Sequence, residues 1–456
     1  MTEALYISGA LAFSAAAVLA FGTAMELEGR LRYLMVPALY ALILINVCAG
    51  PLLQGRDIFA VGTLAAPTAA AKWFTRLIIV TVLTICLARM VAAAFSRENR
   101  GAGGGALLAA LLFYFITNTV LASTFGTYPQ FNHDQYYVPF LFAAVYASRT
   151  QDPEISIGYA KVALFSLLAA SCLVALVAPD VAIESNYRGW LPGVTIRFWG
   201  LETHANSMAP LALVYLFLAI HQPFERRWLQ WLGMALGIGV LLLAQSKTTW
   251  SAAAIAIPAL LVLRRRAWRA TAFSLVGLGA LAGLVLLFAP ALEDPLAALA
   301  QSEQAQDATG LTGRDIIWSV AIQEWMRNPL FGYGVTMWND AYRMQIGLDH
   351  AVSAHNQFLQ ALSVAGAMGL IGLVVYLGAL AAYALRAARA SRGLSVALLV
   401  LIALRCLTET PLGIGTFLSG AFMTQLLLFH ITLVYGYRAA RAAPPATSTL
   451  SAQRRS

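Results

Sequence analysis

The feature that most constrains this chain is a series of long apolar runs separated by short polar connections. A helix needs roughly 20 apolar residues to cross the hydrocarbon core of a bilayer. A membrane β-barrel would instead show residue-by-residue alternation, which these runs lack. We therefore expect an all-α polytopic bundle of about thirteen (12–14) transmembrane helices. The runs fall near residues 5–25, 31–53, 76–95, 106–124, 135–148, 157–178, 203–221, 229–245, 249–263, 270–289, 357–385, 394–407 and 416–436.

Charge and cysteine content exclude several classes of protein. Charged residues make up 11% of the chain, whereas a soluble domain carries about 25%, so an ordinary soluble enzyme is excluded. The net charge of +9 lies in short clusters between apolar runs, which is typical of topology signals and predicts no nucleic-acid partner. The four cysteines lie inside apolar runs without metal-ligand spacing, so we expect no metal and no cofactor.

The domain organisation follows from the uninterrupted series of runs. We expect one transmembrane domain over residues 1–441, because no repeat or linker divides it. The stretch at 442–456, rich in Ala, Pro, Ser and Thr, predicts a disordered cytoplasmic tail. The N-terminus lacks a basic region and an obvious cleavage motif, so its first apolar run is expected to remain as a span.

The basic clusters predict the orientation of the spans. They fall in every second connection, and positively charged short connections stay cytoplasmic, which predicts an N-out, C-in topology. The other connections then face outward: 54–75, 125–134, 179–202, 246–248, 290–356 and 408–415. The longest, at 290–356, is expected to be a functional periplasmic loop. Its apolar residues from Ile316 to Met326 have helical spacing, which predicts an amphipathic helix against the membrane or the bundle.

Basic residues in the outward connections indicate a binding site for an anion. They are Arg188, Arg197, Lys247 and Arg314. Each one taken alone fits an ion pair with a local carboxylate or a lipid headgroup. Together they favour a diphosphate pocket, because guanidinium groups offer planar bidentate donors and ammonium a mobile point charge.

A histidine at the end of the long loop is the candidate general base. Histidine is the usual general base near neutral pH, so His355 could take a proton from a hydroxyl nucleophile, while Asn356 orients a sugar or a neighbouring carbonyl. The alternative is that His355 is a structural residue. Ionisable residues also occur in or beside spans, where they need partners. For Arg405 and Glu409 the i, i+4 spacing predicts a local salt bridge.

Several ordered motifs resemble the superfamily of O-antigen ligases and of O-antigen and exopolysaccharide polymerases. Over roughly residues 180–410 they are Arg197-Phe198-Trp199-Gly200, His204-Ala205-Asn206, Ser246-Lys247-Thr248, the run from Leu311 to Trp318, the run from Asn328 to Gly334, the run from Ala354 to Gln360, and Gly366.

The resemblance implies a metal-independent, inverting membrane glycosyltransferase with a GT-C-type fold in the bacterial inner membrane. Its donor would be an undecaprenyl-diphosphate-linked oligosaccharide, held by Arg197 and Arg314, with Lys247 and Arg188 as further candidates. The active site would face the periplasm, and His355 would activate a hydroxyl of a glycan or lipid-linked acceptor. Membrane lipids and polysaccharide assembly proteins are the other expected partners. Trp318, with the loop's other tryptophans, would stack on sugars or anchor the loop at the interface.

Two choices stay open from the sequence. A ligase would transfer the glycan to lipid A-core, whereas a polymerase would transfer it to another lipid-linked repeat. The Leu-Thr-Gly-Arg-Asp-Ile-Ile-Trp form, ending at Trp318, slightly favours an exopolysaccharide-type polymerase. A transporter or flippase of lipid-linked sugars would also need cations, but such proteins often show paired halves. An assembly scaffold would leave the basic residues unexplained.

Overall fold

The protein is built almost entirely from helices, as expected. The computed structural model describes residues 18–56, 64–96, 103–187, 189, 191, 193–264, 314–348 and 351–442. It is 75% helical. In the described residues the sheet is limited to the strands β1 (Ile183–Glu184) and β2 (Arg197–Phe198), which pair antiparallel with Ile183 opposite Phe198. The all-α polytopic class is thus confirmed.

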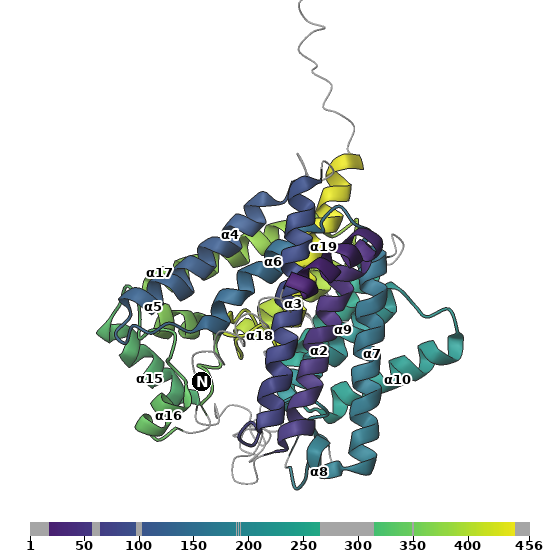
Figure 1. Cartoon of the computed structure of the whole chain (residues 1–456). Coiled ribbons are helices and arrows are strands. Elements are labelled where there is room, and N and C mark those ends of the chain that lie inside the picture. The colour runs from purple at the N-terminus through teal and green to yellow at the C-terminus, as the bar shows by residue number, and fades with distance from the viewer. Residues whose placement is uncertain are drawn as a thin grey trace, which may run out of the picture.

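The helices follow the apolar runs of the sequence closely (Figure 1). They are η1 (Arg32–Leu34), α2 (Met35–Gln54), α3 (Ala69–Phe95), α4 (Gly105–Phe115), the π-helical η3 (Ile116–Val120), α5 (Leu121–Phe125), η4 (His133–Tyr137), α6 (Val138–Ala147), α7 (Pro153–Val177), α8 (Pro179–Ala182), α9 (Ala205–His221), α10 (Arg227–Leu243), α11 (Lys247–Arg264), α15 (Arg314–Arg327), α16 (Asp340–Ile346), α17 (Gln357–Ala387), α18 (Leu394–Cys406) and α19 (Gly420–Ala442).

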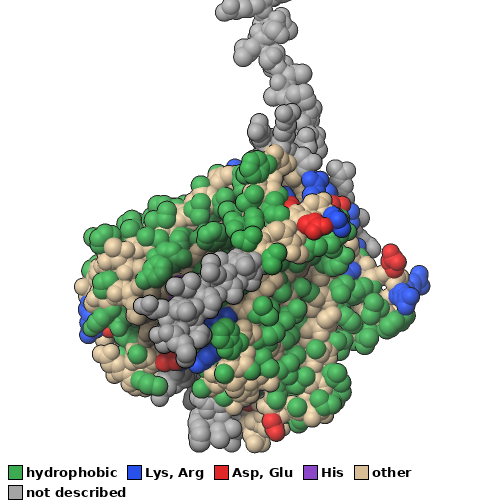
Figure 2. All heavy atoms as spheres, in the orientation of Figure 1, with side chains coloured by type: hydrophobic (Ala, Val, Ile, Leu, Met, Phe, Trp, Pro, Cys, Tyr) green, Lys and Arg blue, Asp and Glu red, His purple; other side chains and the backbone are tan. Residues whose placement is uncertain are grey.

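Six helical segments of the described residues are long and apolar enough to cross a bilayer, and three shorter apolar helices, α9, α10 and α18, accompany them. Figure 2 shows hydrophobic side chains over most of the visible surface, as expected for a lipid-facing bundle. One predicted connection, the loop expected near Arg30, is not formed. Val18–Gln54 is instead a continuous helical segment that contains the single turn of η1. The predicted run at 270–289, the start of the first run and residues 443–456 lie outside the described residues.

The predicted outward connections meet one another in the structure. The side chain of Arg56, from connection 54–75, donates to the carbonyls of Val181, Gly200, Glu202 and Thr203 in and beside connection 179–202. Residues 127 and 128 donate backbone hydrogen bonds to residues 332 and 333. These contacts join the outward connections in two pairs, 54–75 with 179–202 and 125–134 with 290–356.

The long loop is locked to the bundle through a break in α17. Within α17, Gly366 has φ +63° and ψ −158°, which is not helical. The backbone of Pro329–Gly334 fits into this break: Tyr333 and Gly334 donate to the carbonyls of Ser363 and Val364, and Ala367 donates to Pro329. A Cβ atom at Gly332 would lie 2.6 Å from the backbone of Ala365, and one at Gly366 would lie 2.3 Å from that of Leu330. Only glycine permits this approach.

The amphipathic helix predicted in the loop is α15, and it packs against the bundle. Ile317 and Ala321 are buried in a cluster with Tyr333 and Trp338. Ile316 and Met326, on other faces of α15, are exposed. The helix therefore has one apolar face for the protein and further apolar side chains free to meet lipid.

Candidate functional site

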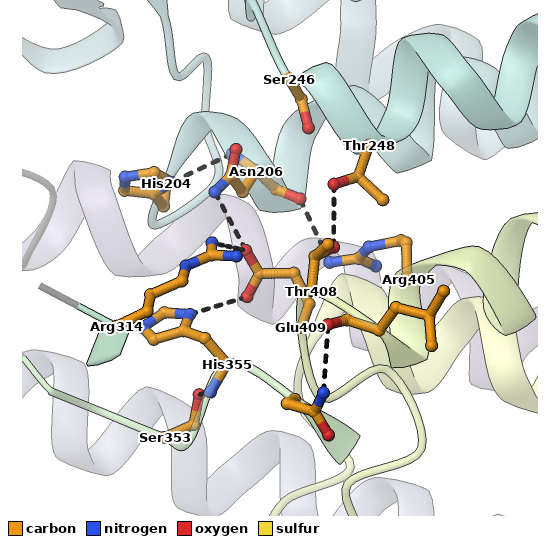
Figure 3. Close-up of polar contacts among 12 residues, drawn as sticks. His204, Asn206, Ser246, Thr248, Arg314, Ser353, His355, Arg405, Thr408 and Glu409 are labelled. Carbon is orange, nitrogen blue, oxygen red and sulfur yellow. Dashed lines mark hydrogen bonds and ion pairs between the residues drawn. The ribbon is translucent and has the colours of Figure 1, made fainter. Parts of the chain in front are cut away.

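The carboxylate of Glu409 is the centre of a polar cluster at the loop end of the bundle. It lies just after α18, and Figure 3 shows Asn206, Arg314 and His355 pointing toward it. One carboxylate oxygen, Oε2, lies 3.0 Å from Nδ1 of His355. The other, Oε1, lies 3.4 Å from an Arg314 nitrogen and accepts a hydrogen bond of 3.0 Å from the Asn206 amide. Residues far apart in the sequence thus share one anionic partner.

Arg197 joins this cluster through Asn206. Its guanidinium donates to the side-chain oxygen of Asn206 at 2.9 Å and to the carbonyl of Ala244 at 3.2 Å. It also lies over the ring of Tyr187, 4.8 Å from the ring centroid. The guanidinium of Arg405 donates to the backbone carbonyl of Asn206 at 3.2 Å. The first turn of α9 therefore links Arg197 of the earlier loop and Arg405 of α18 to the Glu409 cluster.

The hairpin between α10 and α11 reaches the same region. The hydroxyl of Thr248 hydrogen-bonds that of Thr408 at 2.8 Å, directly before Glu409. Lys247 is the first residue of α11, so its backbone lies next to this contact. The structure thus brings the predicted Lys247 hairpin beside the cluster. Contact of the Lys247 ammonium group with the diphosphate of a glycan donor stays a prediction.

The backbone at His355 is held in an unusual conformation. His355 has φ +45°, in the left-handed region that non-glycine residues rarely occupy. Three contacts hold the turn: the indole nitrogen of Trp318 donates to the carbonyl of Ala354 at 2.9 Å, the Gln360 side chain accepts from the Ala354 nitrogen, and the Ser353 hydroxyl accepts from the His355 nitrogen. Strained backbone of this kind gathers at functional sites.

Asn356 is the N-cap of α17. Its side-chain oxygen accepts from the backbone nitrogens of Phe358 and Leu359, and its NH₂ group donates to the carbonyl of Leu407 at 3.2 Å. These bonds satisfy free donors at the helix start and tie it to the end of α18. Asn356 thus positions the turn that carries His355, and its predicted contact with a sugar stays a prediction.

The electrostatics of the cluster keep Glu409 ionised. Burial by itself raises the pKa of the Glu409 carboxyl, but the hydrogen bond and charge of His355, with Arg405 and Arg314, outweigh burial and hold its pKa below the ordinary value. Burial, followed by the charge of Arg197, lowers the pKa of His204 to about 4. A neutral His204 can accept a hydrogen bond through Nδ1, and it accepts one of 3.0 Å from the backbone nitrogen of Asn206.

The hydrogen bond to Glu409 decides which nitrogen of His355 can act as a base. A carboxylate can only accept, so we assign the proton of the neutral imidazole to Nδ1. The lone pair then lies on Nε2. A histidine oriented by a carboxylate in this way can remove a proton from a hydroxyl, and the resulting imidazolium is stabilised by the same carboxylate.

The sequence-predicted residues are brought together in large part. Arg197, Arg314 and His355 belong to one hydrogen-bonded cluster, and Trp318 supports the His355 turn. Arg188 lies outside the described residues.

The predicted local salt bridge between Arg405 and Glu409 is not among the ion pairs of the described residues, although the charge of Arg405 still lowers the pKa of Glu409. The Glu409 carboxylate bonds His355, Arg314 and Asn206, because tertiary packing brings these groups closer than its helix neighbour. Sequence reasoning therefore missed the roles of Glu409 and Asn206. The available signals were an acidic residue in an outward connection and the His204-Ala205-Asn206 motif.

Comparison with known families adds an independent finding. Residues 232–377 match the family model described as O-antigen ligase. The matched range contains Lys247, Arg314 and His355, and it supports assignment of the chain to the O-antigen ligase and polymerase superfamily. No curated protein matches the chain.

Proposed function

We propose that this chain, as a protein of the O-antigen ligase and polymerase superfamily, transfers a glycan from an undecaprenyl-diphosphate-linked donor to an acceptor hydroxyl. The observation that carries the proposal is the Glu409 carboxylate, which joins His355 to Arg314 at the loop end of an apolar bundle. The contacts join the proposed base to a cation, and we propose that this end of the bundle lies at the membrane boundary. A lipid-linked diphosphate matches these features, because its lipid tail suits the membrane and its diphosphate suits the cations.

The donor diphosphate is proposed to bind Arg314 and Arg197. The Arg314–Glu409 contact, at 3.4 Å, is at the long end for a charged pair, so exchanging it for phosphate oxygens costs little. The exposed Ile316 and Met326 of α15 lie in the same helix as Arg314 and offer apolar contacts to a polyprenyl chain. The lipid tail can therefore stay in hydrocarbon while the diphosphate meets the guanidinium groups.

The proposed reaction is an in-line displacement with inversion at the anomeric carbon. Nε2 of His355 takes the proton of the acceptor hydroxyl as its oxygen bonds to the anomeric carbon. The bond from that carbon to the diphosphate oxygen breaks, and the electron pair leaves on the polyprenyl diphosphate. Arg314 and Arg197 stabilise the charge that grows there, and Glu409 stabilises the imidazolium, which later releases its proton to the leaving diphosphate or to solvent.

Two acceptors fit this chemistry. The Leu-Thr-Gly-Arg-Asp-Ile-Ile-Trp form ending at Trp318 favours a polymerase that adds glycan to a second lipid-linked repeat. Transfer to lipid A-core by a ligase is the second candidate, and the match to the family model is compatible with both acceptors. In both cases we place the protein in the bacterial inner membrane with the site facing the periplasm, as the positive-inside pattern predicts.

Reconstituted full-length protein tests the proposal. It is given a polyprenyl-diphosphate oligosaccharide with either lipid A-core or a second lipid-linked repeat, and products are resolved by gel and mass spectrometry. We expect His355→Ala and Arg314→Ala to abolish transfer, while Arg438→Ala, which removes an exposed ion pair with Asp152, keeps it. Normal transfer by both site variants contradicts the mechanism, and the acceptor that is consumed decides between polymerase and ligase.

A further inference from the structure

A pocket of about 270 Å³ opens beside the His355 turn and plays no part in the mechanism above. It is lined by η3, η4, the segment 335–339, the first turn of α17 and residues 413–415. None of the described residues that line it carries a charge. Six of them are amides: Asn118, Asn132, Gln135, Asn339, Gln357 and Gln360.

Two buried polar atoms in this lining have no partner in the described structure. They are the side-chain oxygen of Gln135 and the indole nitrogen of Trp338. Gln135 is 8% exposed and Trp338 is 5% exposed, so water outside the protein does not satisfy them freely. An unpaired buried polar group costs about 1–3 kcal/mol. Both residues line the same cavity, so a ligand that supplies both a donor and an acceptor matches this part of the lining.

The rest of the lining is rigidly held. The Gln357 side chain accepts from the Leu412 nitrogen at 2.9 Å and donates to the Tyr114 hydroxyl at 3.3 Å. Asn339 and Asn132 accept from backbone nitrogens as caps of α16 and η4. Asn118 lies in the π-helical turn η3, and π-turns inside helices occur frequently at functional sites. A fixed set of amides is suited to selective binding.

The chemistry of the lining decides the class of ligand. A diphosphate needs cations, and a polyprenyl chain gains nothing from six amides. A sugar ring matches the lining, because its hydroxyls both donate and accept and its C–H face packs on aromatic rings such as that of Trp338. The volume corresponds to about nine water molecules at ~30 Å³ each, which is room for one monosaccharide residue.

The pocket and the cations lie on different elements that meet at His355. The cation cluster draws on β2, α9, α15 and α18, whereas the pocket draws on η3, η4 and α17. The chain crosses between them twice, from Val352 to Gln357 and from Glu409 to Gly413. A sugar in the pocket therefore lies next to the turn that carries the base, on a part of the site separate from the diphosphate ligands.

We infer that this amide pocket binds one uncharged sugar residue of a glycan substrate, with Asn118, Gln135 and Trp338 as its ligands. The inference rests on the proposed glycan transfer and adds a specificity subsite to it. The sugar belongs either to the acceptor or to the donor glycan, and kinetics separate these sources.

Saturation-transfer NMR on the detergent-solubilised full chain tests binding without requiring catalysis. The probes are methyl α-D-glucopyranoside, methyl N-acetyl-β-D-glucosaminide and methyl α-L-rhamnopyranoside. We expect at least one to receive saturation and to lose affinity by about fivefold to tenfold in Asn118→Leu and in Gln135→Leu, as expected for one lost hydrogen bond. The matched control is Asn46→Leu on α2, whose amide accepts from Thr75 outside the pocket.

The outcomes separate this inference from the proposed function. His355→Ala should abolish transfer and leave probe binding unchanged. Binding that depends on Asn118 and Gln135 without any glycan transfer by the wild type supports the sugar site and contradicts the function. The sugar site is overturned, even where transfer occurs, if no probe receives saturation from the wild type or if saturation is unchanged in both pocket variants. Where the wild type transfers glycan, a KM that rises only for the acceptor in the pocket variants assigns the sugar to the acceptor. A KM that rises only for the donor assigns it to the donor glycan.

Discussion

Replacing Glu409 by glutamine tests whether the carboxylate makes His355 a base. Glutamine keeps the size of the side chain and can still accept from Asn206. It removes the charge that faces the imidazolium formed during transfer. Its NH₂ group can also donate to Nδ1 of His355, which places the imidazole proton on Nε2 and leaves no lone pair there for the acceptor hydroxyl.

The geometry gives the magnitude of this effect. Two unit charges 3.0 Å apart attract by about 5.5 kcal/mol at an effective dielectric constant of about 20. The side chains of His355 and Glu409 are 23% and 15% exposed, so we keep about half of that attraction. The remainder, about 2.8 kcal/mol, corresponds to a kcat about 100-fold lower. The wrong tautomer extends the expected loss toward about 10⁴-fold.

Steady-state transfer kinetics in proteoliposomes measure the prediction, with melting temperature as the folding control. We expect kcat to fall in Glu409→Gln while the KM for acceptor changes little. In Glu409→Ala, sodium formate should restore part of the activity and sodium chloride at equal concentration should not, a response that a purely structural role does not produce. A kcat within threefold of wild type in well-folded Glu409→Gln would refute the assignment of Glu409 as the partner of the base.

Three further predictions follow from the contacts around the site. Arg197→Lys cannot keep both the Asn206 and Ala244 bonds, so the donor KM in the transfer assay should rise about tenfold; an unchanged KM would exclude Arg197 from the donor site. Burial lowers the pKa of Arg56 to about 10, so it stays charged at neutral pH, and Arg56→Ala should reduce unfolding free energy by about 2–4 kcal/mol in denaturant titration. Finally, the depressed pKa of Glu409 makes its ionised form stabilising above the ordinary value of 4.5. The melting-temperature advantage of wild type over Glu409→Gln should therefore persist near neutral pH and vanish as pH falls through the lower folded value; an advantage that grows in acid would contradict the ion pair.

The sequence predicted the bundle well because hydropathy reports burial in lipid residue by residue. The apolar runs at 76–95 and 157–178 correspond to α3 and α7, whose bounds differ from them by a few residues. Ionisable residues within spans were expected to need partners, and Arg89 in α3 bonds Glu28, the Ser148 hydroxyl and the Ala147 carbonyl.

The cluster around Glu409 could not be predicted in the same way. A charge four residues from Arg405 on a helix predicts a local pair, and only tertiary packing shows that His355 and Arg314 are nearer. The sugar pocket was equally hidden, because its amides come from four separate segments and each one taken alone suits an ordinary turn. Sequence patterns report neighbours along a helix, whereas these sites depend on neighbours across loops.

The backbone lock at Gly332 and Gly366 has a consequence for how such chains can vary. Neither position can gain a side chain unless the facing backbone moves, since the two segments approach within the space of one Cβ atom. Residues 127–128, 329–334 and 363–368 share one hydrogen-bonded unit, so they constrain one another as a block. A chimera that exchanges the long loop between relatives should therefore fold only when all three segments come from the same parent. In that case the long loop is inherited together with the two segments that pack against it.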